Sequence, residues 1–187
     1  MEKGTSGFDE VGDWNSIAFA WSLYALFLKS GFLNMFNRTL LLILLVIDFI
    51  WLKSSYGKFS GGKFISGMEG TLKKFAEGNP YPPVKDFLFS VAIPNASLFG
   101  TLTMWGEALV GLTLLISIIW LLFKKDSNNT ATLLLLLGLL GGAFLNAVFY
   151  FSSGWISPSS ESLNLLMFMV EVIAAFYALK LLLHINH

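Results

Sequence analysis

The chain has 187 residues, of which 55% are hydrophobic and 13% are charged, and its formal net charge is zero. A soluble domain carries about 25% charged residues, so this composition indicates an integral membrane protein of one domain. The zero net charge gives no reason to expect a nucleic-acid partner. The absence of cysteine excludes disulfides and thiolate-bound metals within this chain, and its two histidines lie at the far C-terminal end. We therefore expect that this chain ligates no metal or haem.

Residues 1–37 form an N-terminal segment before the first long apolar run. Their apolar core, IAFAWSLYALFL, ends at Lys29 and is short for a span, which needs roughly 17–25 residues. We interpret residues 14–36 as an aromatic-rich helix that lies in the membrane interface. A fifth spanning segment is the alternative.

Residues 38–187 are predicted to form an all-α integral membrane domain, a bundle of four transmembrane helices. The predicted spans are about 38–56, 96–123, 130–151 and 163–183. Lysines and arginines in short loops mark the cytoplasmic side of a membrane. They lie before the first span and between the second and third spans, so we predict a multi-pass protein of the cell membrane with both termini cytoplasmic.

The loop over residues 57–95 then lies outside the cell and is predicted to be partly helical. Apolar residues recur at helical spacing from Phe64 to Phe75, which is typical of an amphipathic helix. The proline-rich run 78–83 must end this helix, and a second short helix is predicted over 84–93. Asn95-Ala96-Ser97 is a glycosylation sequon close to the membrane, whose occupancy the sequence leaves open.

Each predicted span carries a polar residue that we place in the same, outer half of the membrane. Ionisable side chains within a bilayer are costly and usually face a protein interior. We therefore expect a shared polar pocket that opens to the outer side. The alternative is that these groups only pair with one another and hold the helices together. The residues are Asp48, Glu107, Asn146, Tyr150 and Glu171.

Lysines and tryptophans border this predicted pocket. Lys53, Lys58 and Lys63 follow the first span, where an anion arriving from outside would meet them; simple extension of their ammonium groups to the interface is the alternative. Trp105 lies near Glu107 and could flank a quinone ring, or it could pack in the core. The other tryptophans near helix ends are typical of an interfacial belt, namely Trp51, Trp120 and Trp155.

Small residues indicate where the predicted helices approach one another. Gly138 and Gly142 share a helical face with Asn146 and Tyr150, at a spacing of four residues. Because glycine has no side chain, this face lets a neighbouring helix come close. We interpret these glycines as packing positions.

An ordered set of short motifs resembles the DoxD branch of the DoxX-like membrane proteins. It begins with Arg38 at the start of the first span and continues through the loop into the second span. The motifs are Gly57-Lys58-Phe59, Leu72-Lys73-Lys74-Phe75-Ala76, Asn79-Pro80, Phe87-Leu88, Ile93-Pro94-Asn95-Ala96-Ser97-Leu98-Phe99 and Gly106-Glu107-Ala108-Leu109-Val110-Gly111-Leu112. The resemblance covers roughly residues 38–180.

This resemblance implies the membrane subunit of a thiosulfate:quinone oxidoreductase, which works with a smaller DoxA-type subunit in sulfur oxidation. Thiosulfate would be oxidised to tetrathionate, and a membrane quinone would be the electron acceptor. On this hypothesis Lys58 and Lys53 meet the anion, whereas Glu107 and Glu171 handle protons or contact the quinone. We place Asp48, Trp105, Asn146 and Tyr150 at the substrate or quinone.

Two other functions fit the same residues. The chain could be a non-catalytic accessory subunit of a larger respiratory assembly, such as a quinol oxidase complex, in which the polar residues only pack. It could also be a small transporter for an anion or acid, although it lacks the internal repeats and broken helices that transporters often have.

Overall fold

Four long helices form the body of the protein in the computed structural model, which describes residues 38–123 and 129–184. They are the helix Arg38–Ser60, α4 (Ala96–Phe123), α5 (Asn129–Ser153) and α6 (Pro158–His184). All four are long and apolar enough to cross a membrane. The described residues contain helices and turns and no strand. The predicted all-α bundle of four membrane helices is therefore confirmed, whereas the predicted interfacial helix at 14–36 lies outside the described residues.

The largest extensions beyond the predicted spans are at the end of the first helix and the start of the fourth. The first helix continues to Ser60, and Gly62, with a φ of +63°, follows its end in the left-handed conformation that glycine adopts without strain. The fourth helix begins at Pro158, because proline is well suited to the first position of a helix, where its missing N–H is not needed. A short 3-10 turn, η2 (Gly154–Ile156), joins α5 to α6.

The segment between the first two spanning helices folds into a small helical layer, which we call the cap. It consists of α2 (Met68–Glu77), α3 (Pro82–Phe87) and the π-helix η1 (Leu88–Ala92). The cap has its own apolar core, formed by Met68, Leu72, Ala76, Leu88 and Ala92. The predicted amphipathic helix begins at Met68, one turn later than Phe64. The second short helix, predicted over 84–93, begins at Pro82, within the proline-rich run 78–83.

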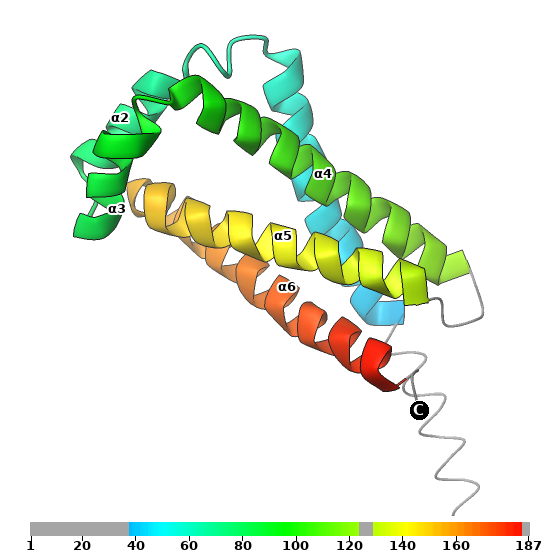
Figure 1. Cartoon of the computed structure of the whole chain (residues 1–187). Coiled ribbons are helices and arrows are strands. Elements are labelled where there is room, and N and C mark those ends of the chain that lie inside the picture. The colour runs from blue at the N-terminus through cyan, green and yellow to red at the C-terminus, as the bar shows by residue number, and fades with distance from the viewer. Residues whose placement is uncertain (1–37, 124–128, 185–187) are drawn as a thin grey trace, which may run out of the picture. The chain divides into compact units, whose positions relative to one another are not determined.

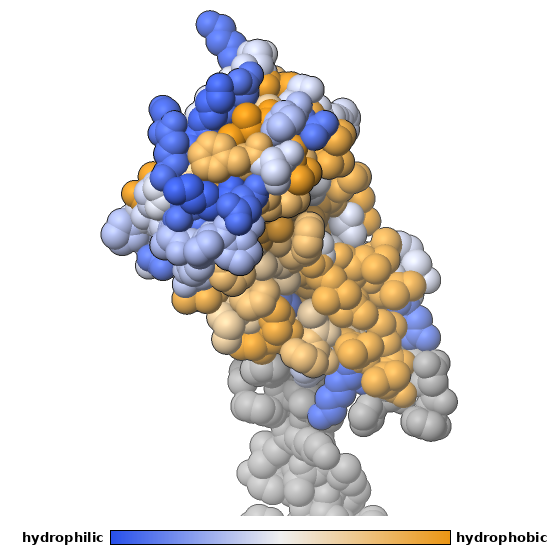
Figure 2. Space-filling view, turned by 60° about the vertical axis from the view of Figure 1, so that its left-hand side comes forward, coloured by the Kyte–Doolittle hydropathy of each residue, from blue (hydrophilic) through white to orange (hydrophobic). Residues whose placement is uncertain are grey.

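The cap covers one end of the bundle, where α4 begins and α5 ends (Figure 1). Hydrophilic side chains gather over the cap, and hydrophobic side chains cover the spanning helices below it (Figure 2). Exposed large apolar side chains lie on every spanning helix, as expected for surfaces that face lipid.

Small residues and close van der Waals contact hold the spanning helices together, because apolar burial drives little association in lipid. Leu44, Leu114, Ile118 and Leu139 are fully buried in the core of the bundle. A Cβ added at Gly138 would lie 2.9 Å from a methyl carbon of Leu114. The predicted packing role of Gly138 is thus consistent with the tight contact between α4 and α5.

Candidate functional site

An ion pair joins the first spanning helix to α4. Lys58 Nζ lies 2.5 Å from Glu107 Oε2 and also donates to Ser54 Oγ at 2.7 Å. The side chain of Glu107 is only 2% exposed, and that of Lys58 is 18% exposed. A carboxylate at this depth requires a partner. The structure thus brings together two residues that the sequence assigned to different tasks, Lys58 to an anion and Glu107 to protons.

A second buried carboxylate belongs to Glu171 on α6, which is completely inaccessible. The indole Nε1–H of Trp51 donates to its Oε1 at 2.8 Å, and Asn146 Nδ2 donates to its Oε2 at 2.7 Å. Three helices therefore meet at this carboxylate. A Cβ at Gly142 would lie 2.8 Å from Glu171 Cδ, so this glycine makes room for the carboxylate in addition to bringing the helices close.

Sequence reasoning missed the role of Trp51, which is not part of an interfacial belt but is 3% exposed in the core. An indole N–H that is buried needs an acceptor, and Glu171 provides one. The signal was present in the sequence. Trp51 lies three residues after Asp48 and therefore shares its face of the helix, which is the face that bears the polar residues.

Asp48 is a third carboxyl group buried in the bundle. Its side chain is 2% exposed, and its Oδ1 has no hydrogen-bond partner among the described residues. It is also absent from the walls of the cavity described below. The structure thus does not place Asp48 on the cavity, and its contact with substrate or quinone stays a prediction.

Three other predicted site residues lie away from the buried carboxylates. Trp105 is 53% exposed and packs edge-to-face against Phe59, with their ring centroids 5.1 Å apart. Tyr150 directs its hydroxyl to Glu161 at 3.5 Å, near the start of α6. Lys53 is exposed on the first helix. None of the three lines the cavity, so the structure does not bring them together with Glu107 and Asn146.

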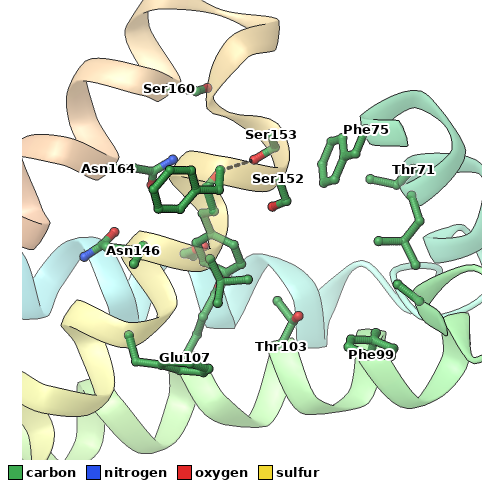
Figure 3. A pocket seen from close by; sticks show the side chains of 18 of the residues that line it. Thr71, Phe75, Phe99, Thr103, Glu107, Asn146, Ser152, Ser153, Ser160 and Asn164 are labelled. Carbon is green, nitrogen blue, oxygen red and sulfur yellow. Dashed lines mark hydrogen bonds between the residues drawn. The ribbon is translucent and has the colours of Figure 1, made fainter. Parts of the chain in front are cut away.

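A cavity of about 760 Å³ lies between the cap and the spanning helices. One wall is formed by Phe99, Thr103 and Glu107, which follow each other at a spacing of four residues along α4 (Figure 3). Thr71 and Phe75 of α2 face it from the cap, and Asn146 and Asn164 face it from α5 and α6. Most of the lining is apolar or aromatic. Its polar groups are spread over several walls, from Thr103 and Glu107 on α4 to the serines at the end of α5 and the start of α6 (Figure 3).

This arrangement is typical of a site for a small organic molecule, because such sites are mostly apolar with a few placed polar groups. Trp51 and Asn146 reach both the cavity and Glu171, so the Glu171 carboxylate lies directly behind the cavity wall. Phe64 also lines the cavity, and its ring centroid lies 5.3 Å from Lys58 Nζ, within the range of a cation–π contact. The groups present can donate hydrogen bonds to a carbonyl oxygen and can exchange protons.

No protein-family profile, curated protein sequence or solved structure matches the chain.

Proposed function

We propose that the cavity is a quinone site and that the chain is the membrane subunit of a thiosulfate:quinone oxidoreductase. The observation that carries the quinone assignment is the cavity itself, which is mostly apolar and aromatic and whose few polar groups include the Lys58–Glu107 pair. A quinone has a flat ring with two carbonyl oxygens and an apolar chain, which suits walls of this kind.

Thiosulfate is proposed as the electron donor from the sequence resemblance to DoxD proteins. Two thiosulfate ions form one S–S bond to give tetrathionate and release two electrons. The quinone accepts these electrons with two protons and becomes a quinol. Carboxyl groups exchange protons readily, so we assign proton exchange to Glu107 and Glu171. Any thiol or disulfide intermediate belongs to the DoxA-type partner, because this chain contains no cysteine.

The test is the reduction of a quinone analogue by thiosulfate in membranes that contain the chain and its DoxA-type partner. A double variant, Lys58→Met with Glu107→Gln, removes both charges of the cavity pair together and leaves no unpaired buried charge. We expect it to lower turnover at least about tenfold, the effect of roughly 1.4 kcal/mol on the barrier. The matched control is Lys73→Met with Glu69→Gln, which removes an exposed ion pair of α2.

Equal turnover in the two double variants would overturn the assignment of the cavity to the reaction. An absence of thiosulfate-driven quinone reduction by the natural pair of subunits would overturn the proposed activity as a whole.

One observation favours an accessory subunit as a second candidate. Two of the three buried carboxyl groups among the described residues have partners within the chain, since Glu107 pairs with Lys58 and Glu171 accepts from Trp51 and Asn146. Such groups can serve only to fix how helices pack. This candidate predicts that the chain co-purifies with the subunits of a respiratory complex and that quinone does not protect the cavity from chemical labelling.

A further inference from the structure

The charge of the cavity restricts what can bind in it. Lys58 and Glu107 are the only charged residues among the described residues that line it, and they neutralise each other at 2.5 Å. A bound anion would lie beside the buried carboxylate of Glu107 without a spare cation to balance it, which is unfavourable where the dielectric constant is low. The cavity therefore favours a neutral ligand.

Lys58 still has a hydrogen bond to offer such a ligand. An ammonium group has three N–H donors, and in this structure Glu107 and Ser54 accept two hydrogen bonds from Nζ. The third can be donated to a neutral acceptor such as a carbonyl oxygen. The Thr103 hydroxyl and the Asn164 amide, both on the cavity walls, provide further neutral polar contacts.

The cavity also reaches the surface of the spanning helices. Five large apolar residues of its lining are well exposed, namely Phe87 at 46%, Phe144 at 67%, Val148 at 42%, Phe151 at 46% and Leu163 at 43%. Phe144 and Val148 belong to α5 within its membrane-spanning length, and they follow each other at a spacing of four residues on one face. This face meets lipid, so the cavity is continuous with the hydrocarbon region.

Contacts at glycines explain why the cavity opens between α4 and α5 near the cap. Toward the end away from the cap, α4 and α5 are in close contact. A Cβ at Gly138 would lie 2.9 Å from Leu114, and a Cβ at Gly141 would lie 3.2 Å from Val110. Nearer the cap the contact is looser, and a Cβ at Gly106 would lie 3.5 Å from Leu145. The two helices separate further toward the cap (Figure 1), and the cavity occupies this region (Figure 3).

We propose that the cavity takes a neutral, long-chain amphiphile sideways from the lipid, between α4 and α5 under the cap. The polar head accepts a hydrogen bond from Lys58, and the hydrocarbon chain leaves past Phe144 and Val148. This inference rests on the proposed function in that the head is a quinone ring. It adds that thiosulfate is oxidised outside this cavity. Lys58 then binds the quinone and not the anion, contrary to the prediction from the sequence.

The test uses the full chain in lipid nanodiscs and a quinone whose isoprenoid tail carries a photoreactive group. We expect the probe to cross-link to α5 around Phe144 and Val148, and excess thiosulfate not to reduce the cross-linking. Val148→Trp fills the opening and should weaken binding of the tailed quinone at least about tenfold. Leu137→Trp is the matched control, because Leu137 is 55% exposed on the same helix but does not line the cavity.

Equal binding by the two tryptophan variants, cross-linking outside α5, or displacement of the probe by thiosulfate would each overturn the inference. The proposed function fails separately. If the probe labels α5 as expected but thiosulfate does not reduce quinone in the presence of the partner subunit, the lateral site stands and the donor assignment falls.

Discussion

The buried ion pair and the exposed ion pair of this protein differ in how strongly water and salt screen them. Lys58 and Glu107 form a pair inside the bundle, whereas Glu69 and Lys73 form a pair on the exposed face of α2 at 2.7 Å. The hydrogen bond from Lys73, helped by its positive charge, lowers the pKa of Glu69. Water and salt screen that exposed pair, so it adds little to stability. The buried pair is screened much less, and removal of one partner leaves the other charge buried without a counter-ion.

Lys58→Met alone should therefore destabilise the protein strongly, by about 3–5 kcal/mol, because Glu107 remains buried without a cation. Lys73→Met should change the free energy of unfolding by less than about 0.5 kcal/mol. Addition of Glu107→Gln to Lys58→Met should restore part of the loss. Unfolding in mixed detergent micelles measures all three. A Lys58→Met variant as stable as Lys73→Met would show that the ion pair is not formed.

Among the elements, the cap depends on a few contacts with the end of α5. Asn79, 7% exposed, donates from Nδ2 to the carbonyl oxygens of Phe151 and Ser152, both at 3.1 Å, and its Oδ1 accepts from the Tyr81 N–H at 2.9 Å. The Trp155 ring packs over Gly78, where a Cβ would lie 2.7 Å from Cζ3. The turn between α2 and α3 thus joins the cap to the end of α5, in addition to the contacts that α2 and Phe87 make with α4.

Asn79→Ala should loosen the cap while leaving the spanning helices intact. It removes three hydrogen bonds, and each buried group left unsatisfied costs about 1–3 kcal/mol. We expect faster hydrogen exchange of the backbone amides of α2 and α3 and unchanged exchange in α4 and α6. Asn95→Ala is the control, because the Asn95 side chain makes one exposed bond, to the Val91 carbonyl. Equal exchange in the two variants would contradict the role of Asn79.

The two ends of the helix bundle differ, because only one of them carries the cap. The cap and the η2 turn lie at the end where α5 meets α6, and the end of α4 and the start of α5 lie at the other end. The distribution of basic residues in the short loops predicts that the cap end faces outward. The cavity then lies under the outer surface, in the half of the membrane where the sequence placed the polar residues.

Single cysteines test this orientation, since the natural chain has none. Ser66→Cys in the cap segment and Ser159→Cys at the start of α6 should react with a membrane-impermeant maleimide in intact cells. Asn129→Cys, at the start of α5, should react only after the cells are permeabilised. Labelling of Asn129→Cys and not of the other two in intact cells would reverse the orientation. Labelling of Ser66→Cys without Ser159→Cys would contradict the four-span topology.

Sequence alone determined the four spans within residues 38–187, the amphipathic cap helix and the choice of Glu107, Glu171 and Asn146 as interior groups. These follow from local rules, because lipid forces apolar residues into long helices and forces polar residues to face inward. The rise of 1.5 Å per residue then places each polar group at a depth.

Only the tertiary structure decided which groups meet. Lys58 and Glu107 are 49 residues apart, and Trp51 and Glu171 are 120 residues apart. Depth leaves the rotation of each helix open, and rotation depends on close contacts such as those at Gly138 and Gly142. The packed helices bury Trp51 and leave Trp105 exposed, and they pair Lys58 with a carboxylate in place of an anion. Residue types fix which groups must find partners, whereas helix packing selects the partners.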